Sequence, residues 1–195
     1  MTTLTNSEME QDELREKVNR NLLYIAIFSS VMLFAGLTSA YIVRQADGNW
    51  LQFSLPIMFW ISTGVILLSS ATVNWALMAA KNNNSSHVTL AMGITLALGI
   101  VFCVTQILGW RELTQGGVYF AGKSSNPSGS FMYILSGMHL LHIVSAILYA
   151  AVIFNKSLKQ AYNSKNTAGV RHCAIFWHFL DGLWVYLFIF LLFMQ

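Results

Sequence analysis

The sequence predicts an all-α fold, an integral membrane bundle of five transmembrane helices. The first observation is composition: 55% of the 195 residues are hydrophobic and only 10% are charged, whereas about a quarter of residues are charged in soluble domains. The second is a series of five apolar runs, each close to the ~20 residues that a helix needs to cross roughly 30 Å of hydrocarbon. Polar stretches rich in Asn, Ser and Gly separate these runs.

The chain begins with a polar arm, residues 1–20, ahead of the first expected span at about 21–43. Its five acidic residues are Glu8, Glu10, Asp12, Glu13 and Glu16. A signal peptide starts with a positively charged region instead, so we do not expect one here. Because acidic and basic residues mix over 8–20, we expect a short surface helix that lies against a partner protein or the lipid headgroups.

We expect residues 21–195 to form a single membrane domain. Its other spans are expected at about 55–80, 87–109, 129–154 and 174–194. Pro56 suits the first turn of the second span, where its missing N–H does no harm. A short polar turn, 81–86, leads into the third span, and a flexible loop, 123–129, leads into the fourth.

Basic residues predict the orientation. The N-terminal arm and the second and fourth loops contain Arg15, Lys17, Arg20, Lys81, Lys156, Lys159, Lys165 and Arg171, whereas the opposite side has only Arg44, Arg111 and Lys123. The positive-inside rule therefore puts the N-terminus in the cytoplasm and the C-terminus outside. The formal net charge of only +3 gives no reason to expect nucleic acid as a partner.

The most informative motif is FWHFLDGLW, residues 176–184 of the last span. An acid inside a membrane costs at least a few kcal/mol unless it is paired, protonated or hydrated. Trp177, Asp181 and Trp184 share one helical face through spacings of four and three, and His178 lies at its edge. We therefore expect these residues to have a functional or interfacial role.

Three interpretations of His178 and Asp181 remain open. They form a structural pair, bonded to each other or to a neighbouring helix; they contact a lipid headgroup or another subunit; or they relay protons. A relay needs a chain of acids, but the only acids between Glu16 and Asp181 are Asp47 and Glu112, both on the predicted outer side. The sequence thus argues against a proton channel.

We expect no catalytic, cofactor-binding or metal-binding residue in this chain. His139 and His142 share one face of the fourth span and, with His178, offer three imidazoles. Two histidines on one helix cannot face each other across a haem, and no carboxylate or thiolate completes a metal cage. Cys103 and Cys173 are far apart in sequence and are expected to be free thiols, without c-type haem attachment.

The order and spacing of several segments resemble subunit III of the haem-copper respiratory oxidases, the cytochrome c oxidase subunit III family. These segments are 69–75, Gln106 with Glu112, 130–142 and 176–184. The resemblance runs from about Leu22 to the C-terminus. Longer members have seven helices, and this chain looks like the five-helix bacterial form, which lacks the first two.

The resemblance implies a non-redox accessory subunit of a proton-pumping cytochrome c oxidase in the bacterial inner membrane. Its implied partners are phospholipid and the catalytic subunit I and subunit II, which hold the haem and copper. Whether the complex joins a larger respiratory supercomplex is left open by the resemblance. The subunit would stabilise the catalytic subunit, hold lipid and support proton uptake. The residues expected to make structural, lipid or subunit contacts are His139, His142, Trp177, His178, Asp181 and Trp184.

Two positions depart from the family pattern. Ser30 stands where many members have an intramembrane acid, and Gly109 stands where relatives often have a glutamate. Both departures argue against direct proton handling. The alternatives are a quinol oxidase subunit III of the same fold and, from another class, a small secondary transporter. A transporter predicts paired broken helices and a charged midplane site, and the sequence contains neither.

Overall fold

The computed structural model describes residues 2–46, 48–123, 125–160, 162 and 166–194, with side chains in the first helix from Glu10 onward except Asp12 and Glu13. Lys165, Asp47 and the terminal Gln195 therefore lie outside the described residues. The five helices are α1 (Thr2–Ala46), α2 (Ile57–Lys81), α3 (Ser85–Gln115), α4 (Pro127–Leu158) and α5 (Ala168–Met194). Each contains a stretch long and apolar enough to cross a membrane. The predicted all-α, five-helix fold class is confirmed.

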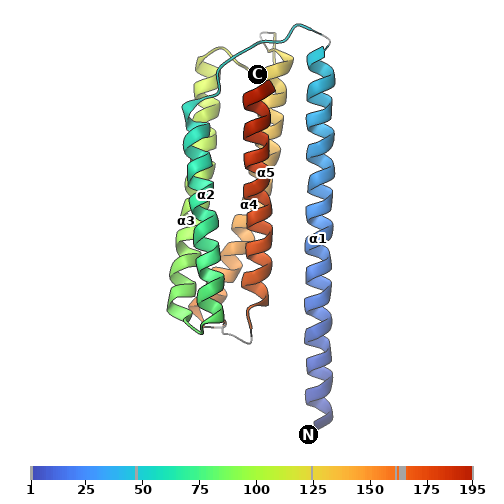
Figure 1. Cartoon of the computed structure of the whole chain (residues 1–195), viewed down its shortest axis with the longest axis vertical. Coiled ribbons are helices and arrows are strands. Elements are labelled where there is room, and N and C mark those ends of the chain that lie inside the picture. The colour runs from blue at the N-terminus through green and yellow to red at the C-terminus, as the bar shows by residue number, and fades with distance from the viewer. Residues whose placement is uncertain (1, 47, 124, 161, 163–165, 195) are drawn as a thin grey trace.

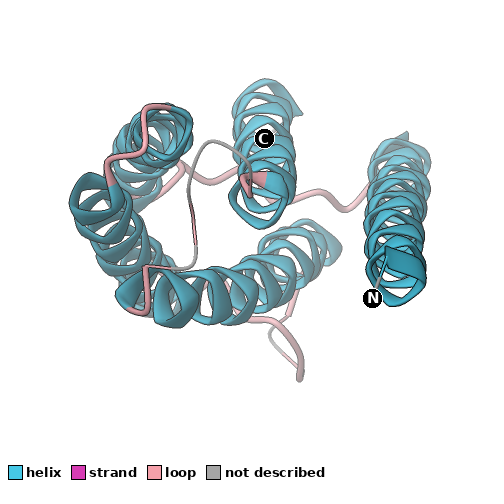
Figure 2. Ribbon diagram, turned by 90° about the horizontal axis from the view of Figure 1, so that it is seen from below, coloured by secondary structure: helices cyan, strands magenta, loops and turns pink. Residues whose placement is uncertain are grey.

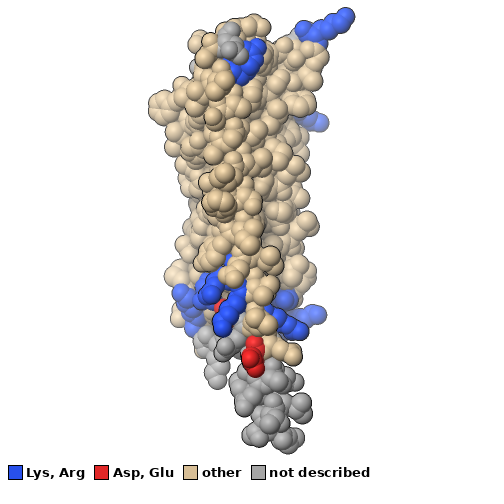
Figure 3. Space-filling model, turned by 90° about the vertical axis from the view of Figure 1, so that its right-hand side faces the viewer, with Lys and Arg blue, Asp and Glu red and all other residues tan. Residues whose placement is uncertain are grey.

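Consecutive helices run in opposite directions (Figure 1). The start of α1, the α2–α3 turn and the α4–α5 connection therefore lie at one end of the molecule, and the C-terminal end of α5 lies at the other. Basic side chains gather at the end where α1 begins, while the middle of the face in Figure 3 carries no charge. An uncharged band between two charged ends suits a bilayer, whose core excludes charge.

Local sequence explains where most helices begin. α2 follows Pro56, and α3 is capped by Asn84, whose side chain accepts a hydrogen bond from the His87 N–H at 3.3 Å. α4 has Pro127 in its first turn and is capped by Asn126, which accepts from the Ser128 N–H at 3.1 Å. Such caps satisfy N–H groups that have no partner inside the helix.

The N-terminal arm differs from the short surface helix expected over 8–20, because those residues continue α1 without a break. No Gly or Pro occurs between Thr2 and Ala35 to interrupt the helix. The 45 residues of α1 extend about 68 Å at 1.5 Å per residue, so α1 projects beyond the other helices at its N-terminal end (Figure 1).

Helices α2 to α5 form the packed part of the molecule, with α2 against α3 and α5, and α4 against α3 and α5. Among the described residues, α1 contacts only α4 and α5, and it stands to one side of the other four (Figure 2). The C-terminal end of α1 is hydrogen-bonded to the end of α5, where the Met194 carbonyl accepts from Gln45 Nε2 at 2.9 Å and from Tyr41 Oη at 3.1 Å. At the other end, Arg171 on α5 forms a salt bridge with Glu16 on α1.

Candidate functional site

The two tryptophans of the last-helix motif are bonded to α2. Trp177 Nε1 donates to Ser69 Oγ at 2.9 Å, and Trp184 Nε1 donates to Thr63 Oγ1 at 3.0 Å. Both indoles are almost fully buried. In lipid, an indole N–H must find its acceptor within the protein, so the hydroxyls of α2 let the apolar face of α5 pack without leaving a donor unpaired.

His178 and Asp181 do not bond to each other. His178 Nδ1 lies 2.6 Å from Ser70 Oγ on α2, and its Nε2 has no partner among the described residues. Asp181 is 3% exposed, and neither of its carboxyl oxygens makes a hydrogen bond within the described part of the chain. The expected pair is therefore divided: His178 is bonded to a neighbouring helix, whereas Asp181 is buried without a bond.

The isolation of Asp181 has a chemical consequence. Burying a carboxylate without a partner costs several kcal/mol, so this site calls for a proton, or for a partner that the described residues of this chain do not supply.

The two histidines of α4 lie in different surroundings. His139 is fully buried among aromatic rings, with its ring centroid 5.2 Å from that of Trp184 and 5.9 Å from that of Phe102. Its two nitrogens have no partner among the described residues. His142 is partly exposed, and its Nδ1 lies 2.7 Å from the Met138 carbonyl of the preceding turn.

These positions do not bring the three imidazoles into one site. Within the described ranges, no group of three or more His, Cys, Asp or Glu side chains could hold a metal ion. Of the six residues expected to matter, Trp177, Asp181, Trp184 and His139 are interior, while His142 and His178 are only partly buried. Of these six residues, only His142 and His178 have part of the side chain at the surface of the chain.

Sequence reasoning missed the hydroxyls that the motif binds. We call Ser62, Thr63, Ser69, Ser70 and Thr72 the α2 hydroxyl row. Besides the contacts above, Ser62 Oγ accepts from Gln106 Nε2 at 2.8 Å, and Thr72 Oγ1 lies 2.8 Å from Thr95 Oγ1. The available signal was the seven-residue spacing of Ser62 and Ser69 and of Thr63 and Ser70 within an apolar run, because such hydroxyls bond across helices in membranes.

The two departures from the family pattern have local explanations. The Ser30 hydroxyl donates to the Ala26 carbonyl one turn earlier, at 2.8 Å, as serine commonly does in a helix. At Gly109, a Cβ atom would lie 2.6 Å from Cε1 of Phe59, a fully buried side chain. The ring of Phe59 therefore occupies the space that a longer side chain at 109 would need.

Comparison with known proteins agrees with this architecture. The family model described as cytochrome c oxidase subunit III matches residues 14–195. The proteins named cytochrome c oxidase subunit 3 from Aepyceros melampus and Pelea capreolus are each 30% identical to this chain over 132 residues, which is 66% of this chain and 47% of theirs. The chain thus matches about half the length of these relatives. Given the extent of the family match and the five apolar helices, this membrane protein belongs to the cytochrome c oxidase subunit III family.

Proposed function

We propose that the chain is a non-redox accessory subunit of a haem-copper terminal oxidase, a cytochrome c oxidase that reduces O2 and pumps protons. The observation that carries this proposal is the family match over residues 14–195. The contacts of the last-helix motif support it, because the two tryptophans and His178 are bonded to the α2 hydroxyl row and so join α5 to α2.

The partners in this proposal are catalytic subunit I and subunit II, which carry the haem and copper, together with phospholipid. The exposed surface of α1 supports such partners, since large apolar side chains cover it along much of its length. Ile25, Phe28, Met32 and Val43 are each more than 45% exposed. In a membrane, such a surface faces lipid or another transmembrane subunit.

The proposed location is the bacterial plasma membrane, with the N-terminus in the cytoplasm. The placement of Arg15, Lys81, Lys156 and Arg171 at one end of the bundle supports this orientation, because positively charged loops are retained on the cytoplasmic side.

For His178 and Asp181 we propose a structural role within the assembly. The bond from His178 to Ser70 supports it for the histidine. For Asp181, a contact with lipid or with a partner subunit remains the second proposal, since the described residues leave its carboxyl group unbonded. A proton relay is the third, and its support is weakest because no second acid accompanies Asp181 in the described bundle interior.

The test is purification of the native complex through an affinity tag on this chain, followed by a subunit census, an optical spectrum and measurement of oxygen consumption. We expect haem and copper in the complex and in its larger subunits. Recovery without any haem-containing partner would contradict the proposal. A copper-containing soluble domain on a partner distinguishes a cytochrome c oxidase from a quinol oxidase, which is the alternative.

A further inference from the structure

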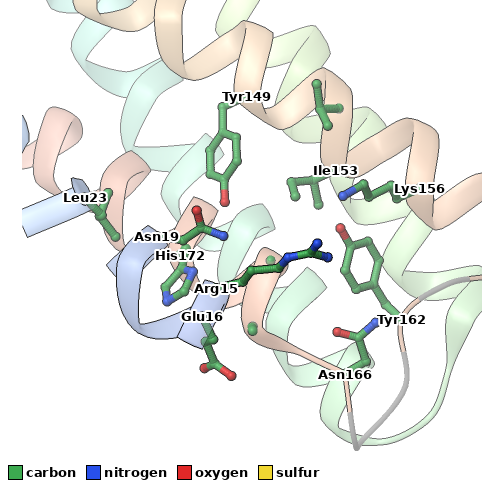
Figure 4. Close-up of a pocket in the computed structure, with 13 residues that line it drawn as sticks. Arg15, Glu16, Asn19, Leu23, Tyr149, Ile153, Lys156, Tyr162, Asn166 and His172 are labelled. Carbon is green, nitrogen blue, oxygen red and sulfur yellow. The ribbon is translucent and has the colours of Figure 1, made fainter. Parts of the chain in front are cut away.

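A small cavity of about 250 Å³ lies at the end of the bundle opposite the start of α1. The connection between α1 and α2, the end of α3 and the loop after α3 enclose it. A larger cavity of about 690 Å³, at the end where α1 begins, has Arg15 and Lys156 in its lining (Figure 4). The small cavity has the opposite charge, because Glu112 is the one charged residue among the described residues that line it.

The walls of the small cavity are apolar and held in place. Pro56, Leu113 and Val118 line it and are buried. The Val118 N–H donates to the Leu113 carbonyl at 2.9 Å, and the Val118 carbonyl accepts from the Tyr133 hydroxyl at 3.0 Å. Gly117, with φ at +81°, lets the chain turn back after α3. Because these walls are already ordered, a ligand loses little free energy in ordering them.

Two features make the small cavity attractive to a cation. Glu112 is exposed, and among the described residues its carboxylate makes no hydrogen bond or salt bridge. The cavity also lies at the C-terminal end of α3, where the helix dipole is negative. The last turn of α3 contains no basic residue, and Arg111, which precedes Glu112, does not line the cavity. The local charge is therefore negative and uncompensated by the residues that line the cavity.

The size and lining of the cavity indicate which cation fits. Calcium takes about 6–8 oxygen ligands, whereas the lining offers only the Glu112 carboxylate and the Ser54 hydroxyl as side-chain acceptors. Those acceptors are also too few for the five N–H groups of a guanidinium, but they suit the three of an ammonium. The volume of about 250 Å³ is below the roughly 300–1,000 Å³ of pockets for small molecules.

We propose that this cavity receives a lysine side chain from an extramembrane segment of a partner subunit, with its ammonium group paired to Glu112. The four-carbon stem of lysine can pack on Phe53, Pro56 and Val118, as long basic side chains commonly do on apolar surface. The partner would exclude water from the pair and so strengthen the attraction. This inference rests on the proposed function only in taking the chain to be part of a multisubunit complex.

The first experiment is carbodiimide cross-linking of the tagged complex, which joins a carboxyl group to an adjacent amine as an amide, with loss of water. Trypsin then cuts after Arg111 and after Lys123 and releases the peptide 112–123, in which Glu112 is the only acidic residue. Mass spectrometry therefore assigns any cross-link in this peptide to Glu112. We expect the peptide to be joined to a lysine of another subunit, and this product to be absent from the Glu112→Gln variant.

Other products of the same reaction would refute the proposal. A cross-link from Glu112 to phosphatidylethanolamine would identify a lipid amine as the ligand, and a cross-link to a lysine of this chain would show that no partner is needed. An unmodified peptide 112–123, in a sample where other acidic residues of the complex are cross-linked, would show that no lysine lies beside Glu112. This experiment uses the unaltered complex, so it does not depend on the assembly of a variant.

A second experiment separates the position of the carboxylate from the total charge. Glu112→Gln with Thr114→Glu restores the net charge but moves the carboxylate about 200° around α3, to an exposed position that does not line the cavity. We expect the single and the double variant to dissociate from the detergent-solubilised complex about threefold or more faster than the unaltered chain, because both lose a bond between charged groups. Normal retention of the double variant would refute the role of the cavity.

The same preparations separate this inference from the proposed function. The optical spectrum and the rate of oxygen consumption test whether the complex is an oxidase, and neither depends on what occupies the cavity. A complex that contains haem and consumes oxygen, but gives no cross-link between Glu112 and a partner lysine, would refute the cavity proposal alone. Such a cross-link in a complex without haem would refute only the proposed function.

Discussion

Replacing Asp181 with leucine should stabilise the isolated chain. The two side chains have the same branched arrangement of four heavy atoms, so leucine fills the same site with little change in shape. Asp181 is 3% exposed and makes no hydrogen bond with the described residues. Leucine at this position therefore leaves no protein donor or acceptor unpaired, and it removes a polar group that is costly to bury.

The expected gain is about 1–3 kcal/mol, the usual cost of a buried polar group without a partner. Asp181→Asn keeps a polar group at the same position and should change stability by less than about 1 kcal/mol. Thr63→Val serves as a reference variant that should lower the free energy of unfolding, because it removes the acceptor of the Trp184 N–H. That change should destabilise the chain by about 0.6 kcal/mol, the average for such bonds between membrane helices, and by no more than about 1.7 kcal/mol, the largest value for them.

The assay is reversible unfolding of the purified chain in mixed micelles, with the three variants measured beside the unaltered protein. If Asp181→Leu destabilises the isolated chain by more than about 1 kcal/mol, the carboxyl group has a partner inside the subunit, and the reasoning is wrong. A second measurement, retention of each variant in the purified complex, separates the proposals for Asp181. Loss of the leucine variant from the complex, despite a stable chain, indicates that lipid or another subunit bonds to the carboxyl group.

Three further predictions follow from packing, topology and composition. Gly109→Ala should lower the free energy of unfolding by about 1–3 kcal/mol, because its Cβ atom would overlap the buried Phe59 ring. Gly36→Ala should not destabilise the chain, because no atom lies within 4 Å of its Cβ position. Equal melting temperatures of the two variants would contradict this prediction. With the native cysteines replaced, a cysteine at Ala121 should react with an impermeant label added outside intact cells and one at Asn82 should not; the reverse result would invert the orientation. The isolated chain should bind no stoichiometric haem, copper or iron by elemental analysis, and a coloured subunit would overturn its non-redox role.

The fold could be predicted from sequence because the membrane imposes simple requirements. A span needs about 20 apolar residues, and polar stretches must lie outside the hydrocarbon. The predicted spans contain only the residues expected within the hydrocarbon, whereas the helices extend beyond these apolar runs. The third and fourth spans were expected to end at about 109 and 154, but α3 ends at Gln115 and α4 at Leu158. Polar residues can extend a helix into the headgroup region as long as no Gly or Pro stops it, so hydropathy underestimates helix length.

The site was harder to predict, because helical spacing identifies a shared face but not what that face meets. Asp181 and His178 are three residues apart, yet the bond of His178 goes to Ser70, 108 residues away in sequence. His139 and His142 have the same spacing, but His139 is enclosed by Phe102 and Trp184. His142 is bonded instead to the Met138 carbonyl of its own helix. Which residues of other helices become partners depends on how each helix is rotated about its axis and shifted along it, and the spacing of residues in the sequence does not specify either.

The attachment of α1 to the end of α5 has a consequence for how the chain is made. Tyr41 and Gln45 donate hydrogen bonds to the carbonyl of Met194, which lies 153 and 149 positions further along the sequence, respectively. The ribosome makes α1 before α2 to α5, yet α1 contacts neither α2 nor α3 among the described residues. Within the described bundle, α1 therefore has no packing partner until α4 has been made, and its hydrogen bonds to Met194 can form only after α5 is complete.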